Sequence, residues 1–164
     1  MTSTEAPRPF PVLGWSDLEV GTTFRTRGRT ITESDVTAFA GLTGDYSQIH
    51  VNRGFAAESV FGRPVAHGLL VLSYAHGLML GTGVFEGEAL AFLGLDDWRF
   101  VRPVFFGDTI YVDFKVGQRR VTSMNSLRGI VRLDVDVVNG NDQTVQLGHK
   151  SLMFSVPPGP VDHG

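Results

Sequence analysis

Residues 66–80 are the segment that most constrains how this chain can fold. They are apolar on nearly every face of a helix, and such a helix must be covered by other elements, most simply by a curved sheet. The run is interrupted by polar and glycine residues and is shorter than the ~20 residues that a membrane span requires. We therefore expect a buried helix and no association with a membrane.

The chain after this helix supplies candidate strands. Segments 89–95, 97–100, 109–116, 127–138 and 144–156 are rich in β-branched and aromatic residues, and several alternate. The sequence Asn-Gly-Asn-Asp at 139–142 predicts a hairpin turn between the last two segments. Before the helix, residues 26–31 suit a strand, Thr32 with Asp35 predicts a helix start, and Val51 or Asn52 opens a short helical turn.

The length of 164 residues fits one α+β domain, with helix and strand segments both present. We place this domain at residues 13–157, between disordered segments at 1–12 and 158–164. The Pro-containing sequences at both ends suit neither a strand nor a helix.

Composition excludes several classes of function. The net charge is −3 and the 14 basic residues are scattered, so nucleic acid is not an expected partner. The absence of cysteine excludes disulfides, thiolate nucleophiles and cysteine-ligated zinc. Residues 1–10 lack the basic start and apolar core of a secretory signal, so we expect a cytoplasmic protein.

The residues with the clearest chemistry lie between the two predicted helices. Asp45 follows Gly44, a residue that tolerates unusual backbone conformations, and His50 lies five positions later. A carboxylate and an imidazole that converge can hold a water molecule, remove a proton from it and return a proton to a substrate carbon. Each residue also has a plainer interpretation, Asp45 as a turn residue bonded to the backbone and His50 as a histidine bonded to a carbonyl.

A second motif, Ala66-His67-Gly68, opens the apolar helix. Free backbone N–H groups at a helix start can stabilise negative charge that develops on a carbonyl oxygen. We expect the Gly68 N–H to form such an oxyanion hole, because a side chain at this position would obstruct the approaching oxygen.

Together these motifs resemble the MaoC-like (R)-specific enoyl-CoA hydratases. That family's signature reads approximately Gly-Asp-x-Asn-Pro-x-His, then Phe-Ala, then Ala-His-Gly-Met/Leu, and it is matched by Asp45, His50, 55–56 and 66–69. The likeness continues through 61–65, 100–104 and 107–109, in the family's order and spacing. The chain departs from the signature at Ser47-Gln48, which replace Asn-Pro, and at Asn52, where the family frequently has Asp.

The resemblance implies a hotdog fold, a long central helix wrapped by a curved antiparallel sheet, in agreement with the predicted elements. It implies a hydratase or dehydratase that interconverts trans-2-enoyl-CoA and (R)-3-hydroxyacyl-CoA, with catalytic Asp45 and His50 and an oxyanion hole at Gly68. Coenzyme A belongs to the substrate, and no separate cofactor is expected. The expected partners are the acyl-CoA substrate and further copies of the chain, in a homodimer, a dimer of dimers or a trimer of dimers.

Further substrate contacts are expected from Ser47, His67, Ser73 and His76. His67 has the alternative role of holding the turn. His76 lies where the family often carries a small residue and where the acyl chain is expected to run, and its alternative is a satisfied core histidine.

No His, Asp or Glu cluster has metal-like spacing, so no metal is expected. Solvated surface charge, rather than contact with coenzyme A phosphates, is the expectation for Arg63, Arg102, Arg119, Arg120 and Lys150.

Two other functions stay open. An acyl-CoA thioesterase of the same fold would direct the water at the carbonyl carbon, although the spacing of Asp45 and His50 disfavours it. A catalytically quiet subunit of a heteromeric dehydratase would shape the tunnel for an active partner, and the intact pair argues against this alternative too.

Overall fold

The structure is a computed structural model that describes residues 13–85, 88–122 and 125–158. The disorder predicted for residues 1–12 and 158–164 falls outside the described residues, Pro158 excepted. In chain order the elements are η1 (Trp15–Asp17), β1 (Thr23–Arg25), β2 (Arg29–Thr30), α1 (Glu33–Thr43), α2 (Gln48–Val51), α3 (Arg53–Glu58), α4 (Gly68–Leu80), β3 (Ala89–Phe100), β4 (Thr109–Thr122), β5 (Asn125–Asn139) and β6 (Thr144–Ser155).

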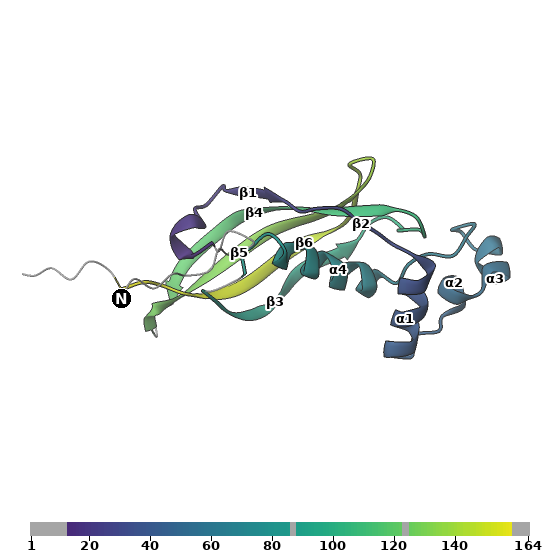
Figure 1. The fold of residues 1–164 in the computed structure, drawn as a ribbon, viewed down its shortest axis with the longest axis horizontal. Coiled ribbons are helices and arrows are strands. Elements are labelled where there is room, and N and C mark those ends of the chain that lie inside the picture. Colours follow the sequence, from purple (N-terminus) through teal and green to yellow (C-terminus); the bar gives the residue numbers. More distant parts are fainter. Residues whose placement is uncertain (1–12, 86–87, 123–124, 159–164) are drawn as a thin grey trace, which may run out of the picture.

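The sheet follows the order β1-β4-β5-β6-β3, with β2 also pairing with β4. Every pairing is antiparallel, and the turn predicted at 139–142 joins β5 to β6. β4 shows the alternation that predicted a strand, because Ile110, Val112 and Phe114 are buried while the positions between them are less so. The sheet curves around α4 (Figure 1), so the hotdog arrangement is confirmed.

α4 packs on this sheet with one face only. Leu70, Val71, Ala75 and Met79 belong to the buried core, whereas Leu69 is 59% exposed. The expectation of a helix buried all round is therefore wrong, because one sheet covers only one side of the helix. Within the described ranges, no helix is both long enough and apolar enough to cross a membrane.

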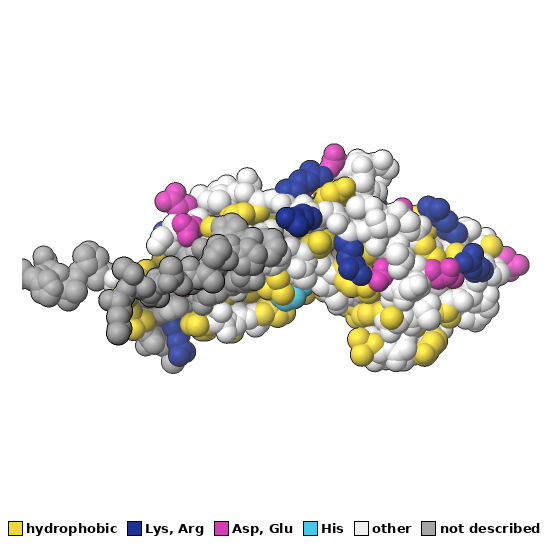
Figure 2. Space-filling view, in the orientation of Figure 1, with side chains coloured by type: hydrophobic (Ala, Val, Ile, Leu, Met, Phe, Trp, Pro, Cys, Tyr) yellow, Lys and Arg dark blue, Asp and Glu magenta, His cyan; other side chains and the backbone are white. Residues whose placement is uncertain are grey.

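β3 forms an edge of the sheet, paired only with β6 in the described chain. It merges the predicted segments 89–95 and 97–100 into one strand, with register shifts and a positive φ of 53° at Asp97. Apolar side chains are exposed along its first half, where Leu90, Phe92 and Leu93 lie, whereas Asp96, Asp97 and Arg99 are exposed further along. Hydrophobic groups reach the surface in this part of the molecule and at the end of α1 (Figure 2), where Leu42 is exposed.

Of the strand predicted at 26–31, only residues 29–30 pair, as β2, and a second short strand, β1, precedes the predicted segment at 23–25. The break between the two strands occurs at Thr26, whose side-chain hydroxyl accepts a hydrogen bond from the Val112 N–H at 3.0 Å. A side-chain oxygen thus replaces a backbone carbonyl in the ladder, and regular pairing stops there.

The helices α1, α2 and α3 form a lobe beyond the end of the sheet (Figure 1). α1 begins with the predicted capping box, in which Thr32 and Asp35 each bond the other's backbone N–H. α3 begins after Asn52, as predicted, and the Asn52 side chain accepts from the Phe55 N–H at 3.1 Å. α2 lies between the two helices that the sequence predicts and was not itself predicted.

Asp35 connects this lobe to the rest of the protein. Its carboxylate accepts hydrogen bonds from the Tyr74 hydroxyl on α4 at 2.6 Å and from Arg29 on β2 at 3.0 Å, in addition to the cap at Thr32. Burial acts to raise the pKa of Asp35, but the hydrogen bonds from Tyr74 and Thr32 and the charge of Arg29 outweigh it and lower the pKa to about 2.

We predict that Asp35→Asn lowers the free energy of unfolding by about 2 kcal/mol at pH 7, because the amide cannot replace these carboxylate interactions. Since the folded-state pKa lies below the unfolded value, the contribution is present above about pH 4 and is lost as the pH falls towards 2. Urea unfolding of both proteins at pH 7, 4 and 3 measures this. The control is Glu33→Gln, which removes a more exposed carboxylate of the same helical turn. Equal losses in the two variants, or a pH-independent loss, would contradict the prediction.

Candidate active site

The turn between α1 and α2 presents Asp45. Gly44 ends α1 in the left-handed conformation, with φ of 78°, and redirects the chain. The Asp45 N–H donates to the Thr43 hydroxyl at 3.3 Å, and Oδ1 of Asp45 accepts from the Ser47 N–H at 3.2 Å. Asp45 is thus a turn residue bonded to the backbone, as its plainer interpretation has it. The turn uses only Oδ1, and the side chain is 51% exposed, so Oδ2 is available to contact water or substrate.

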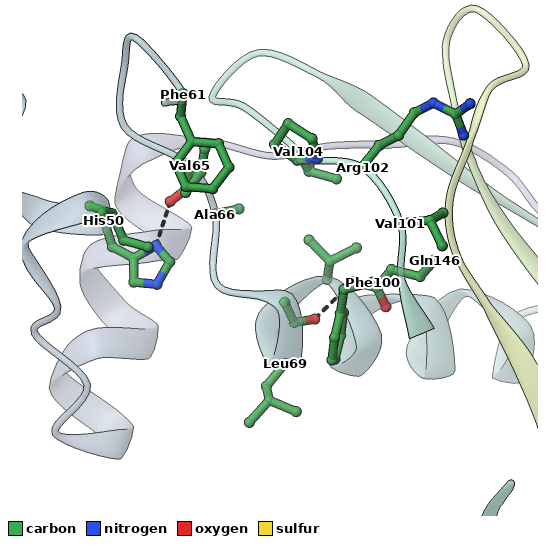
Figure 3. A pocket seen from close by; sticks show the side chains of 14 residues that line it. His50, Phe61, Val65, Ala66, Leu69, Phe100, Val101, Arg102, Val104 and Gln146 are labelled. Atoms are coloured by element: carbon green, nitrogen blue, oxygen red, sulfur yellow. Dashed lines mark hydrogen bonds between the residues drawn. The ribbon is translucent and has the colours of Figure 1, made fainter. Parts of the chain in front are cut away.

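His50, on α2, has a defined orientation. Its Nδ1 lies 2.7 Å from the Val65 carbonyl oxygen (Figure 3), and a carbonyl can only accept, so Nδ1 carries the proton. Nε2 of the neutral ring therefore keeps its lone pair. Burial lowers the pKa of His50, and nearby His67 lowers it further, against the opposing effects of the Val65 hydrogen bond and the Asp45 carboxylate. At neutral pH, His50 is a base.

His67, the residue that precedes α4, is 2% exposed. Its Nε2 donates to the backbone carbonyl of Asp45 at 2.9 Å and lies 3.9 Å from Oδ2 of the same residue. Its ring lies against that of His50, with 3.8 Å between centroids and a tilt of 33° between the planes. The sequence allowed two roles for His67, contact with the substrate or support of the turn. These contacts favour support of the turn.

Side-chain atoms of Asp45, His50 and His67 lie within 4.8 Å of one another. This spacing suits a bridging water molecule, because each of its hydrogen bonds would span ~2.8 Å. The structure thus brings the predicted catalytic pair together, with His67 beside it.

This trio is also the one group in the described ranges whose atoms are close enough to ligate a metal ion. The centroids of the two imidazole rings are 3.8 Å apart, and the ring planes are tilted by 33°. Nε2 of His67 donates to the Asp45 carbonyl, whereas Nδ1 of His67 is buried and has no hydrogen-bond partner among the described residues. The prediction that no metal binds stays a prediction.

A cavity of about 430 Å³ lies between His50 and the start of α4 (Figure 3). Its wall is largely apolar, with Phe61, Leu69 and Phe100 as large contributors. Gly68 lies in the wall, and no acceptor for its N–H is found among the described residues. A Cβ at Gly68 would lie 2.8 Å from the Phe100 ring. Glycine is therefore required by packing here, and its N–H is left free.

The other predicted residues lie in two places. Ser47 supports Asp45 through its N–H, whereas Ser73 and His76 line a second cavity further along α4. Arg63, Arg102 and Arg120 are exposed, as expected.

Lys150 contradicts the expectation of a solvated surface charge. It is 3% exposed and its Nζ contacts Nδ1 of His76 in the second cavity. The signal for its burial lay in the sequence, because Gly148, Lys150 and Leu152 alternate on the inward face of β6.

Comparison with known proteins shows similarity over much of the chain. Residues 17–139 match the model of the MaoC like domain. The chain is 37% identical over 112 residues to protein MaoC of Klebsiella aerogenes, covering 68% of this chain and 33% of that protein. It is 37% identical over 99 residues to the (R)-specific enoyl-CoA hydratase of Aeromonas caviae, covering 60% of this chain and 71% of the relative. The chain thus spans about a third of the length of the Klebsiella protein.

A solved structure described as a monoamine oxidase regulatory protein from an Archaeoglobus species superposes with a TM-score of 0.83 at 31% identity. The superposition covers 90% of this chain and 97% of that one. The similarity therefore extends over most of the chain, and the match at residues 17–139 includes Asp45, His50 and Gly68.

We predict that His50 titrates below its ordinary pKa of 6.5 and is neutral at pH 7 with the proton on Nδ1, because burial disfavours the charged ring and Val65 fixes the tautomer. Long-range ¹H–¹⁵N NMR spectra of the imidazoles over pH 5–8 measure both properties, and a His50→Gln variant assigns the signals. A midpoint above 6.5, or a proton on Nε2, would show that this description of the ring is wrong.

Proposed function

The chain belongs to the MaoC-like domain family, and we propose that it is a hydro-lyase that interconverts trans-2-enoyl-CoA and (R)-3-hydroxyacyl-CoA. One observation carries the proposal: a carboxylate and a neutral imidazole converge beside a largely apolar cavity whose wall contains the free Gly68 N–H. The relative from Aeromonas caviae, an (R)-specific enoyl-CoA hydratase, supports this reaction class.

The pair would activate water by accepting both of its hydrogens. Nε2 of His50 and the free oxygen of Asp45 are both acceptors, so a water between them points its lone pairs away from both, towards the substrate. Asp45 removes a proton as the water oxygen bonds to the β-carbon. The β-hydroxy group is then complete, and one of the pair returns a proton to the α-carbon. Water is consumed without any net change in the protein.

Gly68 would stabilise the charge that this addition creates. As the β-carbon is attacked, negative charge moves to the thioester oxygen, and the Gly68 N–H lies at the positive end of α4. Removal of such a donor typically costs ~3 kcal/mol in the transition state. Gln146 holds the Gly68 carbonyl at 2.9 Å, which helps fix the orientation of this first helical turn.

We infer that two copies pair through β3. This strand has an unpaired edge in the described chain, and its exposed side chains include Leu90, Phe92 and Leu93. An unpaired, apolar edge favours pairing with another strand. The exposed face of α4 lies next to the same cavities as β3, so a partner on β3 would also help enclose them.

We predict that Leu93→Asp shifts the protein from dimer to monomer, because a charge on the apolar edge would be buried by pairing. Analytical ultracentrifugation measures the change. Leu42→Asp is the matched control, since Leu42 is 83% exposed on α1, away from β3. A Leu93→Asp dimer as stable as wild type, or dissociation caused by Leu42→Asp, would place the interface elsewhere.

We predict that Asp45→Asn and His50→Ala each lower the turnover of crotonyl-CoA by about 10²–10⁴-fold, because each removes a group that holds or deprotonates the water. Loss of enoyl-thioester absorbance follows the reaction, chiral analysis checks for the (R) product, and circular dichroism checks folding. His149→Ala is the control, because His149 bonds to Asp134 on the sheet outside this cavity.

Undiminished activity in both site variants would defeat this mechanism. Release of free coenzyme A from saturated acyl-CoA by the wild type would instead support a thioesterase. Inactivity that is rescued by a second protein would support the quiet-subunit alternative.

A further inference from the structure

The second cavity, of about 290 Å³, lies further along α4 and β3 than the first. The first is lined by Gly68, Leu69 and Val71 of α4 and by Phe100 of β3. The second is lined by residues of α4 between 72 and 79 and of β3 between 92 and 98. Leu69, Ser73 and His76 follow one another at spacings of four and three, which places them on one helix face. The two cavities therefore follow one another along α4.

A buried cation lies in this second cavity, whose wall is otherwise mostly apolar apart from Ser73 and His76. Lys150 is 3% exposed, and its Nζ lies 4.8 Å from the centroid of Phe85, 5.3 Å from that of Phe92 and 4.0 Å from the sulfur of Met79. Within the described residues, no carboxylate lies within ion-pair distance of it. Burial lowers the pKa of Lys150 to about 8. An ammonium group in such surroundings is costly unless a counter-charge accompanies it.

The neighbouring His76 extends the donor set. Burial first, and then the charge of Lys150, lower the pKa of His76, so its ring is neutral at pH 7. Because Lys150 donates to Nδ1, the ring proton is on Nε2. The cavity thus holds an ammonium and an imidazole N–H, and both are donors suited to an anion.

We propose that this second cavity binds a carboxylate at the far end of the substrate's acyl chain, through Lys150 and His76. The inference rests on the proposed function and names its substrate class, the ω-carboxyacyl thioesters. Gly68 and His76 are eight helix positions apart, which corresponds to about 12 Å at the ~1.5 Å rise per residue. An extended chain of medium length would therefore connect the oxyanion donor to the carboxylate site.

The test compares the coenzyme A thioesters of trans-2-decenoic acid and of its ω-carboxy counterpart, trans-2-decenedioic acid. For wild type, kcat/KM should be about 10-fold or more higher for the ω-carboxy substrate, because a buried, charge-assisted hydrogen bond discriminates to this extent. Lys150→Met keeps a side chain of similar length without the charge, and should abolish this preference while the decenoyl substrate is processed at least as well. Lys115→Met, at a half-exposed lysine on β4, should leave both substrates unchanged.

A second measurement separates the two proposals. Calorimetry with the coenzyme A thioesters of decanoic acid and of decanedioic acid, the latter esterified at one end only, reports binding without reaction, and the ω-carboxy ligand should bind about 10-fold or more tightly. If wild type hydrates neither enoyl substrate but keeps this binding preference, the proposed reaction fails and the carboxylate site stands. Equal or weaker binding of the ω-carboxy ligand to wild type overturns the carboxylate site, whatever the rate of hydration and whether or not Lys150→Met folds.

Discussion

One-sided packing of α4 against a single curved sheet is the constraint on which the rest of the structure depends. The sheet buries Leu70, Val71, Ala75 and Met79 and leaves the other face of the helix uncovered. Both cavities lie between that helix and β3, and β3 is also an unpaired edge. The residues on the uncovered face of α4 do not take part in the core. They can therefore contact substrate or a second copy of the chain.

Two histidines in contact have opposite roles because their hydrogen bonds differ. His67 uses Nε2 to hold the Asp45 carbonyl and is almost fully buried. His50 uses Nδ1 to hold the Val65 carbonyl, and this leaves Nε2 free. The Asp45 carbonyl belongs to the turn that follows α1, and the Val65 carbonyl belongs to the segment before α4, where the Val65 and Ala66 N–H groups donate to the carbonyls of Ile49 and Val104. The geometry of the proposed reaction is therefore set by buried backbone contacts, and only a few atoms of the site are left to react.

Much of this arrangement could be predicted, because it follows from local patterns. The capping box at Thr32, the turn at 139–142 and the alternation of β4 each leave a direct mark in the sequence. The convergence of Asp45 with His50 also follows from their short separation. By contrast, α2 is a single four-residue turn without a side-chain cap and gives almost no periodic signal. The break at Thr26 depends on Val112, which is distant in sequence, so no local pattern could show it.

For Lys150, the residue type and the position in the strand lead to different expectations. Lysine is rarely buried, so a surface position is the ordinary expectation, yet the alternation of β6 places it between Gly148 and Leu152 on the inward face. An apolar residue of similar size there would pack against Met79 and Phe92 without the cost of desolvating an ammonium. A chain that needed only packing at this point would gain from that replacement. The presence of a cation beside His76, further along α4 than Gly68, is therefore better explained by what the cavity binds than by what holds the fold together.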